Sequence, residues 1–290
     1  MLELNIKNLN KNYKNTSILK NFSIKIGCGI TALLAPNGAG KTTLLKIIST
    51  SSDPSGGDIY LKDESIFNMG KKYRSMIGYL PQKFGVYPNF TAEKFLKYFG
   101  TLKGIPKAQL ENRIDYLLEK VSLLDFKKKK LKTFSGGMIR RIGIAQALLN
   151  NPKILILDEP TVGLDPDERI KFRNFLVELN EDKDKIIILS THIVSDIEEM
   201  ADKILFMKNG KLLNYTTTCD AILNVSSKIY EVLVPKSECS KIKDKYFVTK
   251  CINKKDGMFL RIIGDNPYDT AVEVEPNLED VYVYYYNMVY

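Results

Sequence analysis

Short apolar runs bounded by turn residues alternate with helical patterns between Leu2 and Met207. This alternation is typical of a sheet that is covered by helices. Several of the runs are almost continuous Ile and Leu, as strands buried on both faces require, so we expect a mostly parallel central sheet. The expected strands are residues 2–9, 22–26, 30–34, 76–79, 154–157, 186–189 and 204–207.

The strand pattern is interrupted in the middle of the chain, where helical patterns cover residues 92–102, 107–123 and 136–149. We interpret the interruption, about residues 83–151, as a helical subdomain inserted into the sheet. Asn209-Gly210 lies between two apolar runs and is the strongest hairpin signal in the chain. It closes the first predicted domain, residues 1–215.

The remaining residues, 216–290, have shorter and more mixed segments, which predicts a small C-terminal α+β domain. Strand-like patterns cover residues 230–234, 246–248 and 258–263. Asn277 with Asp280 three residues later indicates a helix start. The tyrosines that follow suit a strand equally well, so the structure of the last segment stays open.

The composition is that of an ordinary globular protein, with 44% hydrophobic and 27% charged residues among 290. No run approaches the roughly eighteen apolar residues of a membrane-spanning helix, and the alternating N-terminus predicts a strand instead of a secretion signal. The cysteines are scattered, which favours reduced thiols in a cytoplasmic protein. A net charge of +9 permits nucleic acid, an anionic membrane or neither as a partner.

Residues 35–43, APNGAGKTT, have the form of a phosphate-binding loop between an expected strand and an expected helix. Such a loop offers backbone amides, a helix N-terminus and small residues to phosphate oxygens. Lys41 should reach the β and γ phosphates and Thr42 should ligate Mg²⁺. Ala35 replaces the usual first glycine, so the loop alone is only suggestive. The predicted nucleotide contacts are Asn37, Gly38, Ala39, Gly40, Lys41, Thr42 and Thr43.

Three polar residues follow buried apolar runs. Asp158 suits the Mg²⁺ shell, and Glu159 can orient or deprotonate an attacking water. The alternative is that this acidic pair caps a helix before Pro160. His192 is the only histidine, and its place at a strand end favours a donor or sensor for the γ phosphate over a structural role.

Other candidates lie where the predicted elements join. Gln82, at the start of the helical insert, can touch Mg²⁺ or the attacking water; the alternative is that it is only a polar loop residue. Tyr13 lies upstream of the phosphate loop and can stack on adenine. Ser135-Gly136-Gly137 opens a helix pattern between the loop and the acidic pair.

These features together resemble, in order and spacing, the ATP-binding subunits of ABC transporters. The resemblance rests on Tyr13, residues 35–43, Gln82, Ser135-Gly136-Gly137, Asp158-Glu159, Gly163-Leu164-Asp165 and His192. It implies an α/β P-loop NTPase fold with a mostly parallel core sheet, an antiparallel β subdomain and an inserted helical subdomain. It also implies a dimer, most simply a homodimer, that encloses two ATP molecules head to tail.

In such a dimer, the Ser135-Gly136-Gly137 tripeptide contacts the nucleotide held by the partner's Lys41, and Asp165 communicates across the interface. Residues 82–91 and 275–282 resemble the type-two export branch of the family. Its members export drugs, antibiotic peptides, polysaccharide or lipid-linked cargo through a separate multispanning subunit. Met138 stands where the family usually has glutamine, from which we expect a changed rate of hydrolysis.

The predicted protein is therefore an ATPase that uses ATP and Mg²⁺ and energises export. It should be cytoplasmic and peripheral on the inner face of the membrane, bound to a multispanning permease. The alternative is a soluble ABC ATPase that acts on nucleic acid or ribosomes, which the charge permits. Such proteins usually carry two ATPase domains or a long coiled coil, so nucleic acid is not the expected partner.

Overall fold

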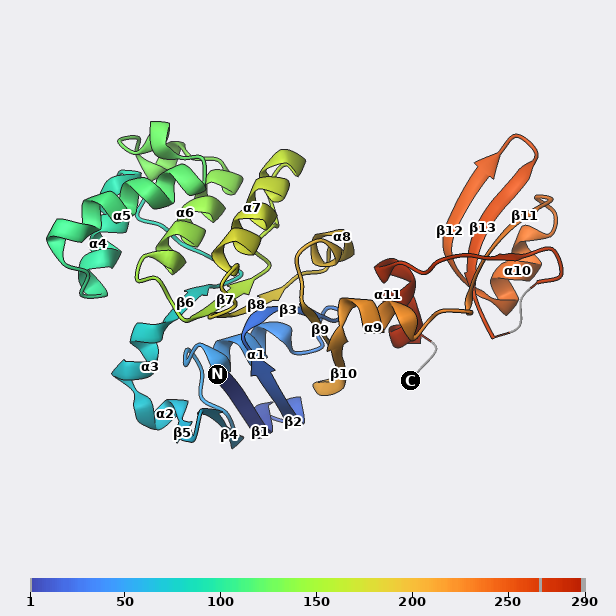
Figure 1. The fold of residues 1–290 in the computed structure, drawn as a ribbon, viewed down its shortest axis with the longest axis horizontal. Helices are drawn as coiled ribbons and strands as arrows, with labels where there is room; N and C mark the ends of the chain where they lie inside the picture. The colour runs from blue at the N-terminus through green and yellow to red at the C-terminus, as the bar shows by residue number, and fades with distance from the viewer. Residues whose placement is uncertain (1, 266–267, 288–290) are drawn as a thin grey trace. The chain divides into compact units, whose positions relative to one another are not determined.

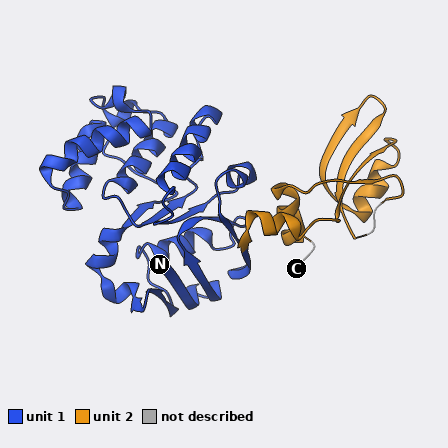
Figure 2. Ribbon diagram, viewed as in Figure 1, with its two compact units in different colours: residues 1–215 blue, residues 216–290 orange. Residues whose placement is uncertain are grey.

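The computed structural model describes residues 2–265 and 268–287 and divides into two compact units (Figure 2). Unit 1 comprises residues 1–215 and unit 2 comprises residues 216–290. Within the described part of the chain, none of the helices combines the length and the apolar character that crossing a bilayer requires.

The central sheet of unit 1 has six strands in the order β10-β9-β3-β8-β7-β6 (Figure 1). The five strands from β9 to β6 pair in parallel, and every residue of β3, β7 and β8 is buried. This confirms the predicted parallel core and explains its Ile and Leu runs. The strands are β3 (Gly29–Leu34), β6 (Ile77–Leu80), β7 (Ile154–Asp158), β8 (Ile186–Ser190), β9 (Lys203–Lys208) and β10 (Lys211–Thr217).

A second, antiparallel sheet has the order β2-β1-β4-β5. Its strands are β1 (Glu3–Tyr13), β2 (Thr16–Gly27), β4 (Gly56–Leu61) and β5 (Glu64–Ser65). Helix α1 (Lys41–Ile48) shares one core with residues of both sheets, including Leu4 of β1 and Ile156 of β7. The short helices α2 (Ile66–Met69) and α3 (Lys71–Met76) then lead from β5 to β6.

The opposite face of the central sheet is covered by helices (Figure 1). The helical insert contains α4 (Ala92–Leu102), α5 (Lys107–Lys120) and α6 (Gly136–Leu148), with 3-10 turns at Leu124–Phe126 and Leu131–Thr133. Thr91 caps α4 by accepting a hydrogen bond from the Lys94 amide. Helices α7 (Pro166–Leu179) and α8 (Val194–Glu198) follow β7 and β8. Successive residues of β7 and β8 therefore face different cores.

Unit 2 contains a four-stranded antiparallel sheet in the order β12-β13-β11-β14. Its strands are β11 (Ile229–Val234), β12 (Phe247–Lys254), β13 (Gly257–Ile263) and β14 (Val272–Glu273). Helix α10 (Cys239–Lys245) buries Ile242 in a cluster with Val232 and Leu260. Helices α9 (Thr218–Leu223) and α11 (Leu278–Asn287) contact each other.

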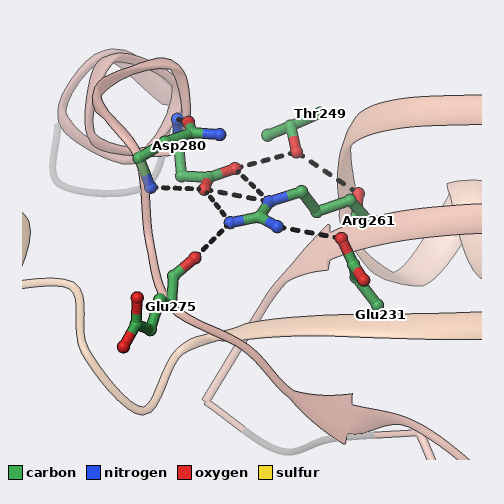
Figure 3. Close-up of polar contacts among 6 residues, drawn as sticks. Glu231, Thr249, Arg261, Glu275 and Asp280 are labelled. Carbon is green, nitrogen blue, oxygen red and sulfur yellow. Dashed lines mark hydrogen bonds and ion pairs between the residues drawn. The ribbon is translucent and has the colours of Figure 1, made fainter.

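The first turn of the segment after Asn277 shows whether this segment is a helix or a strand. The amide of Asp280 donates to Asn277 Oδ1, and the amide of Asn277 donates to Asp280 Oδ2. This reciprocal capping satisfies two amides that a helix leaves free, so the tyrosine-rich segment is helical. Figure 3 shows Arg261 of β13 donating to both carboxylate oxygens of Asp280 and to Glu231. The start of α11 is thereby tied to the sheet.

Candidate active site

The phosphate loop runs from the end of β3 to the start of α1. Gly38 and Gly40 have φ angles of 80° and 106°, which side chains other than glycine rarely adopt. A Cβ on Gly40 would also lie 3.2 Å from the Ile18 carbonyl oxygen. The loop is closed by a hydrogen bond of 3.3 Å from the Ala39 amide to the Pro36 carbonyl. Helix α1 begins at Lys41, so its N-terminus directly follows the loop.

A cavity of about 310 Å³ brings together residues from the loop and from the ends of β6 and β7. The phosphate-loop residues meet Gln82 and Glu159 there, and Ile18 closes the cavity from β2. The carboxyl ends of parallel strands form the usual ligand edge of such a sheet. The lining residues are Ile18, Asn37, Gly38, Gly40, Lys41, Thr42, Thr43, Gln82 and Glu159.

Lys41 is almost completely buried beside this cavity. Its Nζ donates to the carbonyl oxygens of Ala35 at 2.7 Å and Pro36 at 3.2 Å. Burial lowers the pKa of Lys41, and the carboxylates of Glu159 and Asp158 act against that shift. An ammonium group held only by neutral carbonyls can exchange them for the stronger interaction with a phosphate.

Asp158 is fully buried at the end of β7. Its Oδ1 accepts a hydrogen bond of 2.7 Å from the Ser190 hydroxyl, whereas its buried Oδ2 has no hydrogen-bond partner. An unpartnered buried carboxylate oxygen fits a divalent cation. No group of three or more His, Cys, Asp or Glu side chains suited to a metal is present in the described ranges. The residues that would hold Mg²⁺ are Asp158 and, from the cavity lining, Thr42 and Gln82.

Glu159 and His192 form a direct pair, with 2.7 Å between Oε2 and Nδ1. The Glu159 side chain is only 7% exposed, whereas that of His192 is 58% exposed. Glu159 has a left-handed φ of 55°, and its amide donates to the carbonyl and hydroxyl oxygens of Ser190. The alternative of a helix cap is wrong, because the next helix begins only at Pro166.

A second and larger cavity of about 980 Å³ adjoins the first through Asn37, Gln82 and Glu159. Its lining also includes His192 and Gly136. Gln82 and Glu159 therefore face both the phosphate loop and the helical insert.

Eight predicted site residues do not line the cavity that contains Lys41: Tyr13, Ala39, Ser135, Gly136, Gly137, Asp158, Asp165 and His192. Ser135 Oγ instead caps α6 by accepting from the Met138 amide at 3.2 Å. A Cβ on Gly137 would lie 2.8 Å from the Gly163 carbonyl oxygen, so glycine is required for this close approach. Asp165 precedes α7 and is exposed. Tyr13 is also exposed, with Lys11 Nζ 5.0 Å from its ring centre.

Comparison with known proteins matches residues 19–162 to the ABC transporter family. The chain is 40% identical over 210 residues to the ABC transporter ATP-binding protein YxlF of Bacillus subtilis, covering 72% of this chain and 69% of YxlF. It is 35% identical over 218 residues to the linearmycin resistance ATP-binding protein LnrL of the same organism, covering 75% of this chain and 70% of LnrL. The chain belongs to the ABC transporter ATP-binding proteins.

The fold is similar to that of solved ABC ATPases. An ATP-binding subunit of an ABC transporter superimposes with a TM-score of 0.70 at 28% identity, covering 77% of this chain and 93% of that one. The dimeric structure of the bacterial ABC transporter cassette MJ0796 gives a TM-score of 0.69 at 28% identity, covering 74% of this chain and 98% of that one. This ABC protein is an ATPase, and the predicted P-loop fold with its parallel and antiparallel sheets is confirmed.

Sequence reasoning about this ABC ATPase missed Ser190 and Arg140. Ser190 binds both Asp158 and the Glu159 amide, and its position as the first polar residue after an apolar strand could have indicated it. Arg140 lines the larger cavity from α6. Its only sequence signal is a charged residue one turn after Gly136, on a helix that is otherwise mostly apolar.

Proposed function

We propose that this ABC ATPase energises export through a separate membrane subunit and works as a head-to-tail dimer. The proposal rests chiefly on one observation. The cavity containing Lys41 is lined by the phosphate loop, Gln82 and Glu159, but not by Ser135 or Gly137 of the same chain. A second copy of the chain is the simplest source of a Ser135-Gly136-Gly137 tripeptide, the signature tripeptide, that completes the site.

In this proposal the residues of the site have separate roles. The phosphate loop binds the ATP phosphates through its amides and Lys41. Asp158, Thr42 and Gln82 would hold Mg²⁺ through their oxygens, and the ion would neutralise phosphate charge. Glu159 orients or deprotonates the attacking water, and its bond to His192 fixes the direction of the carboxylate. Tyr13 stacks on adenine, and Asp165 contacts the second protomer.

Two observations favour export through a membrane partner. LnrL is described as a linearmycin resistance protein, and a second relative, 32% identical over 233 residues, is the Nod factor export ATP-binding protein I of Ralstonia nicotianae. The helical insert also carries exposed aromatic side chains. Tyr87 is 47% exposed and Tyr98 is 42% exposed, and their rings pack edge to face. Such a surface suits a protein partner. We therefore place the protein on the cytoplasmic face of a membrane.

The decisive experiment replaces Glu159 by Gln. The variant should bind ATP-Mg²⁺ but hydrolyse it at least about a hundredfold more slowly, and it should accumulate as a dimer in gel filtration with ATP. Glu181→Gln, an exposed change in the same unit, is the matched control and should behave as wild type. A monomeric Glu159→Gln protein in saturating ATP-Mg²⁺ would contradict the dimer model.

Export is tested separately by purifying the native complex from membranes. We expect a multispanning subunit to co-purify with the ATPase. Salt-sensitive binding of DNA or RNA by the purified chain, without such a subunit, would instead favour a soluble ABC ATPase that acts on nucleic acid.

A further inference from the structure

Arg140 occupies an unusual position between the two strand ends that carry Gln82 and Glu159. It lies on α6 and is only 7% exposed. One nitrogen, Nη1, donates to the carbonyl oxygens of Pro81 at 2.8 Å and Gln82 at 3.1 Å. The other, Nη2, donates to the carbonyl oxygens of Asp158 and, at 2.7 Å, Glu159. A single guanidinium group therefore joins the peptides that follow β6 and end β7.

This arrangement is costly for a purely structural contact. All four acceptors are neutral main-chain oxygens, and the buried Nε has no hydrogen-bond partner. Burial lowers the pKa of Arg140, while the carboxylates of Asp158 and Glu159 act in the opposite direction. An apolar side chain of similar volume would avoid the desolvation of a charge. The retained charge thus calls for an explanation beyond packing.

The contacts of Arg140 determine how the Glu159 peptide is held. Glu159 adopts a left-handed conformation at φ 55°. Its amide is fixed by Ser190 at 3.1 and 3.0 Å, and its carbonyl is fixed by Arg140. With both ends of the residue restrained, the side chain is directed toward His192 and the cavity. Removing the Arg140 contact would allow this strained residue to relax.

Arg140 also lies five residues after Ser135, which caps the same helix. Five residues correspond to about one and a half helical turns, or about 7.5 Å along the axis. A shift of α6 would therefore move the guanidinium that donates to the Gln82 and Glu159 carbonyls together with Ser135-Gly136-Gly137. Helix α6 therefore links the segments of Gln82 and Glu159 to Ser135-Gly136-Gly137.

We propose that Arg140 is a positioning residue for ATP hydrolysis, which sets the relative placement of Gln82 and Glu159 and links both to α6. The inference rests on the proposed roles of Gln82, Glu159 and Ser135. Arg140 lines the larger adjoining cavity but not the one that contains Lys41 and Thr42. Its loss should therefore slow the hydrolytic step and leave ATP binding nearly unchanged.

The test compares Arg140→Lys and Arg140→Met with changes of the same type at Arg141. Arg141 lies next on α6 but donates to the carbonyls of Val121 and Ser122 and pairs with Glu168, and it lines neither cavity of the site. We expect kcat to fall about tenfold in Arg140→Lys, because an ammonium cannot span both pairs of carbonyls, and about a hundredfold in Arg140→Met. The KM for ATP should change by less than about threefold in both.

The Arg141 variants should keep wild-type kcat even where thermal melting shows lost stability. Rates are expressed per ATP-binding site, measured by equilibrium binding, so that a partly unfolded preparation still gives a valid kcat. A kcat within about twofold of wild type in Arg140→Met would overturn the proposal. So would a loss of activity caused by KM alone, since Arg140 would then support nucleotide binding.

Glu159→Gln in the same assay tests the proposed function separately from the role of Arg140. Normal turnover in Glu159→Gln would overturn the proposed function itself. Slow turnover in Glu159→Gln together with normal turnover in Arg140→Met would overturn only the role of Arg140.

Discussion

Arg140 in unit 1 and Arg261 in unit 2 are both largely removed from solvent, yet their guanidinium groups meet different partners. Arg140 donates to four main-chain carbonyls, and burial lowers its pKa. Arg261 donates to the carboxylates of Asp280 and Glu231, and the hydrogen bond to Asp280 raises its pKa. The charge of Arg261 is neutralised where it is bound. The charge of Arg140 is only partly balanced, by carboxylates that it does not touch.

Three other cations of unit 1 resemble Arg140, whereas Lys120 and Lys127 of the same unit bind carboxylates as Arg261 does. In unit 1, Lys41, Lys103 and Arg113 donate to neutral oxygens, and burial lowers the pKa of each. In unit 2, Lys228 meets the hydroxyl of Tyr284 and the carboxylate of Asp265, which raise its pKa. Of the three in unit 1, only Lys41 lines the cavity of the site, where a cation bound by neutral groups favours an incoming anion such as ATP. Cations bound by carboxylates act as structural ties.

The largest expected effect comes from Asp280→Ala in unit 2. It leaves Arg261 without its main partner and removes the reciprocal cap of α11. We expect the free energy of unfolding of unit 2 to fall by about 3–5 kcal/mol, measured by urea denaturation of the full chain. Glu279→Gln, an exposed neighbour, should stay within about 0.5 kcal/mol of wild type. A loss below about 1 kcal/mol would mean that Asp280 is not a structural tie.

Lys41→Met should act on ligand binding instead of stability. Loss of the charge-assisted contacts to phosphate should weaken ATP-Mg²⁺ binding by about 1.5–3 kcal/mol, or about 10- to 150-fold. The free energy of unfolding should not fall, since burial already disfavours this ammonium. Equilibrium binding of a fluorescent ATP analogue measures the change. Lys46→Met, an exposed position on the same helix, should bind normally.

Arg261→Lys keeps the charge but loses the planar fork that reaches Asp280, Glu231 and the Glu275 carbonyl. We expect a loss of about 1–2 kcal/mol in the free energy of unfolding, smaller than for Asp280→Ala, and no change in ATP turnover. Chemical denaturation and a steady-state ATPase assay measure the two quantities. A clear fall in kcat would remove the distinction between the two arginines.

The smallest effect concerns Lys103, whose pKa burial lowers to about 8 and whose Nζ donates to Asn150 Oδ1. Below pH 8 the folded protein carries a poorly solvated ammonium, and between about pH 8 and 10 it loses that proton while the unfolded chain keeps it. Stability relative to Lys103→Met should therefore rise by about 1 kcal/mol from pH 8 to pH 9. Parallel urea titrations at both pH values test the sign; a falling difference would contradict it.

The sequence predicts strands and helices best where burial imposes a regular pattern. The run at residues 154–157 becomes β7, and the pattern at residues 92–102 becomes α4 with the same limits. Helix α7 was not predicted, because only Phe172, Phe175 and Leu176 are buried among its fourteen residues. The last helix was ambiguous because its tyrosines also suit strands, and the capping by Asn277 and Asp280 decides between them.

Within the site, the loop residues, Gln82 and Glu159 line one cavity. Their positions after expected strands predict this, because the ends of parallel strands form the ligand edge of the sheet. The role of Arg140 depends on how α6 packs against β6 and β7, a tertiary contact that no local pattern encodes. The bond between Glu159 and His192 likewise joins two strand ends distant in sequence. The predicted roles of Tyr13, Ser135 and Asp165 depend on ligand and partner contacts and stay predictions.

The contact between α9 and α11 has a consequence for the order in which the two units form during protein synthesis. Every strand of the unit 1 sheets has been made once β10 leaves the ribosome, so unit 1 can fold while later residues are still being translated. Unit 2 must wait, because its first helix packs on its last described helix and Arg261 binds Asp280 there. A chain released before α11 is made would carry a finished ATPase core and a unit 2 sheet whose Arg261 lacks the carboxylate of Asp280.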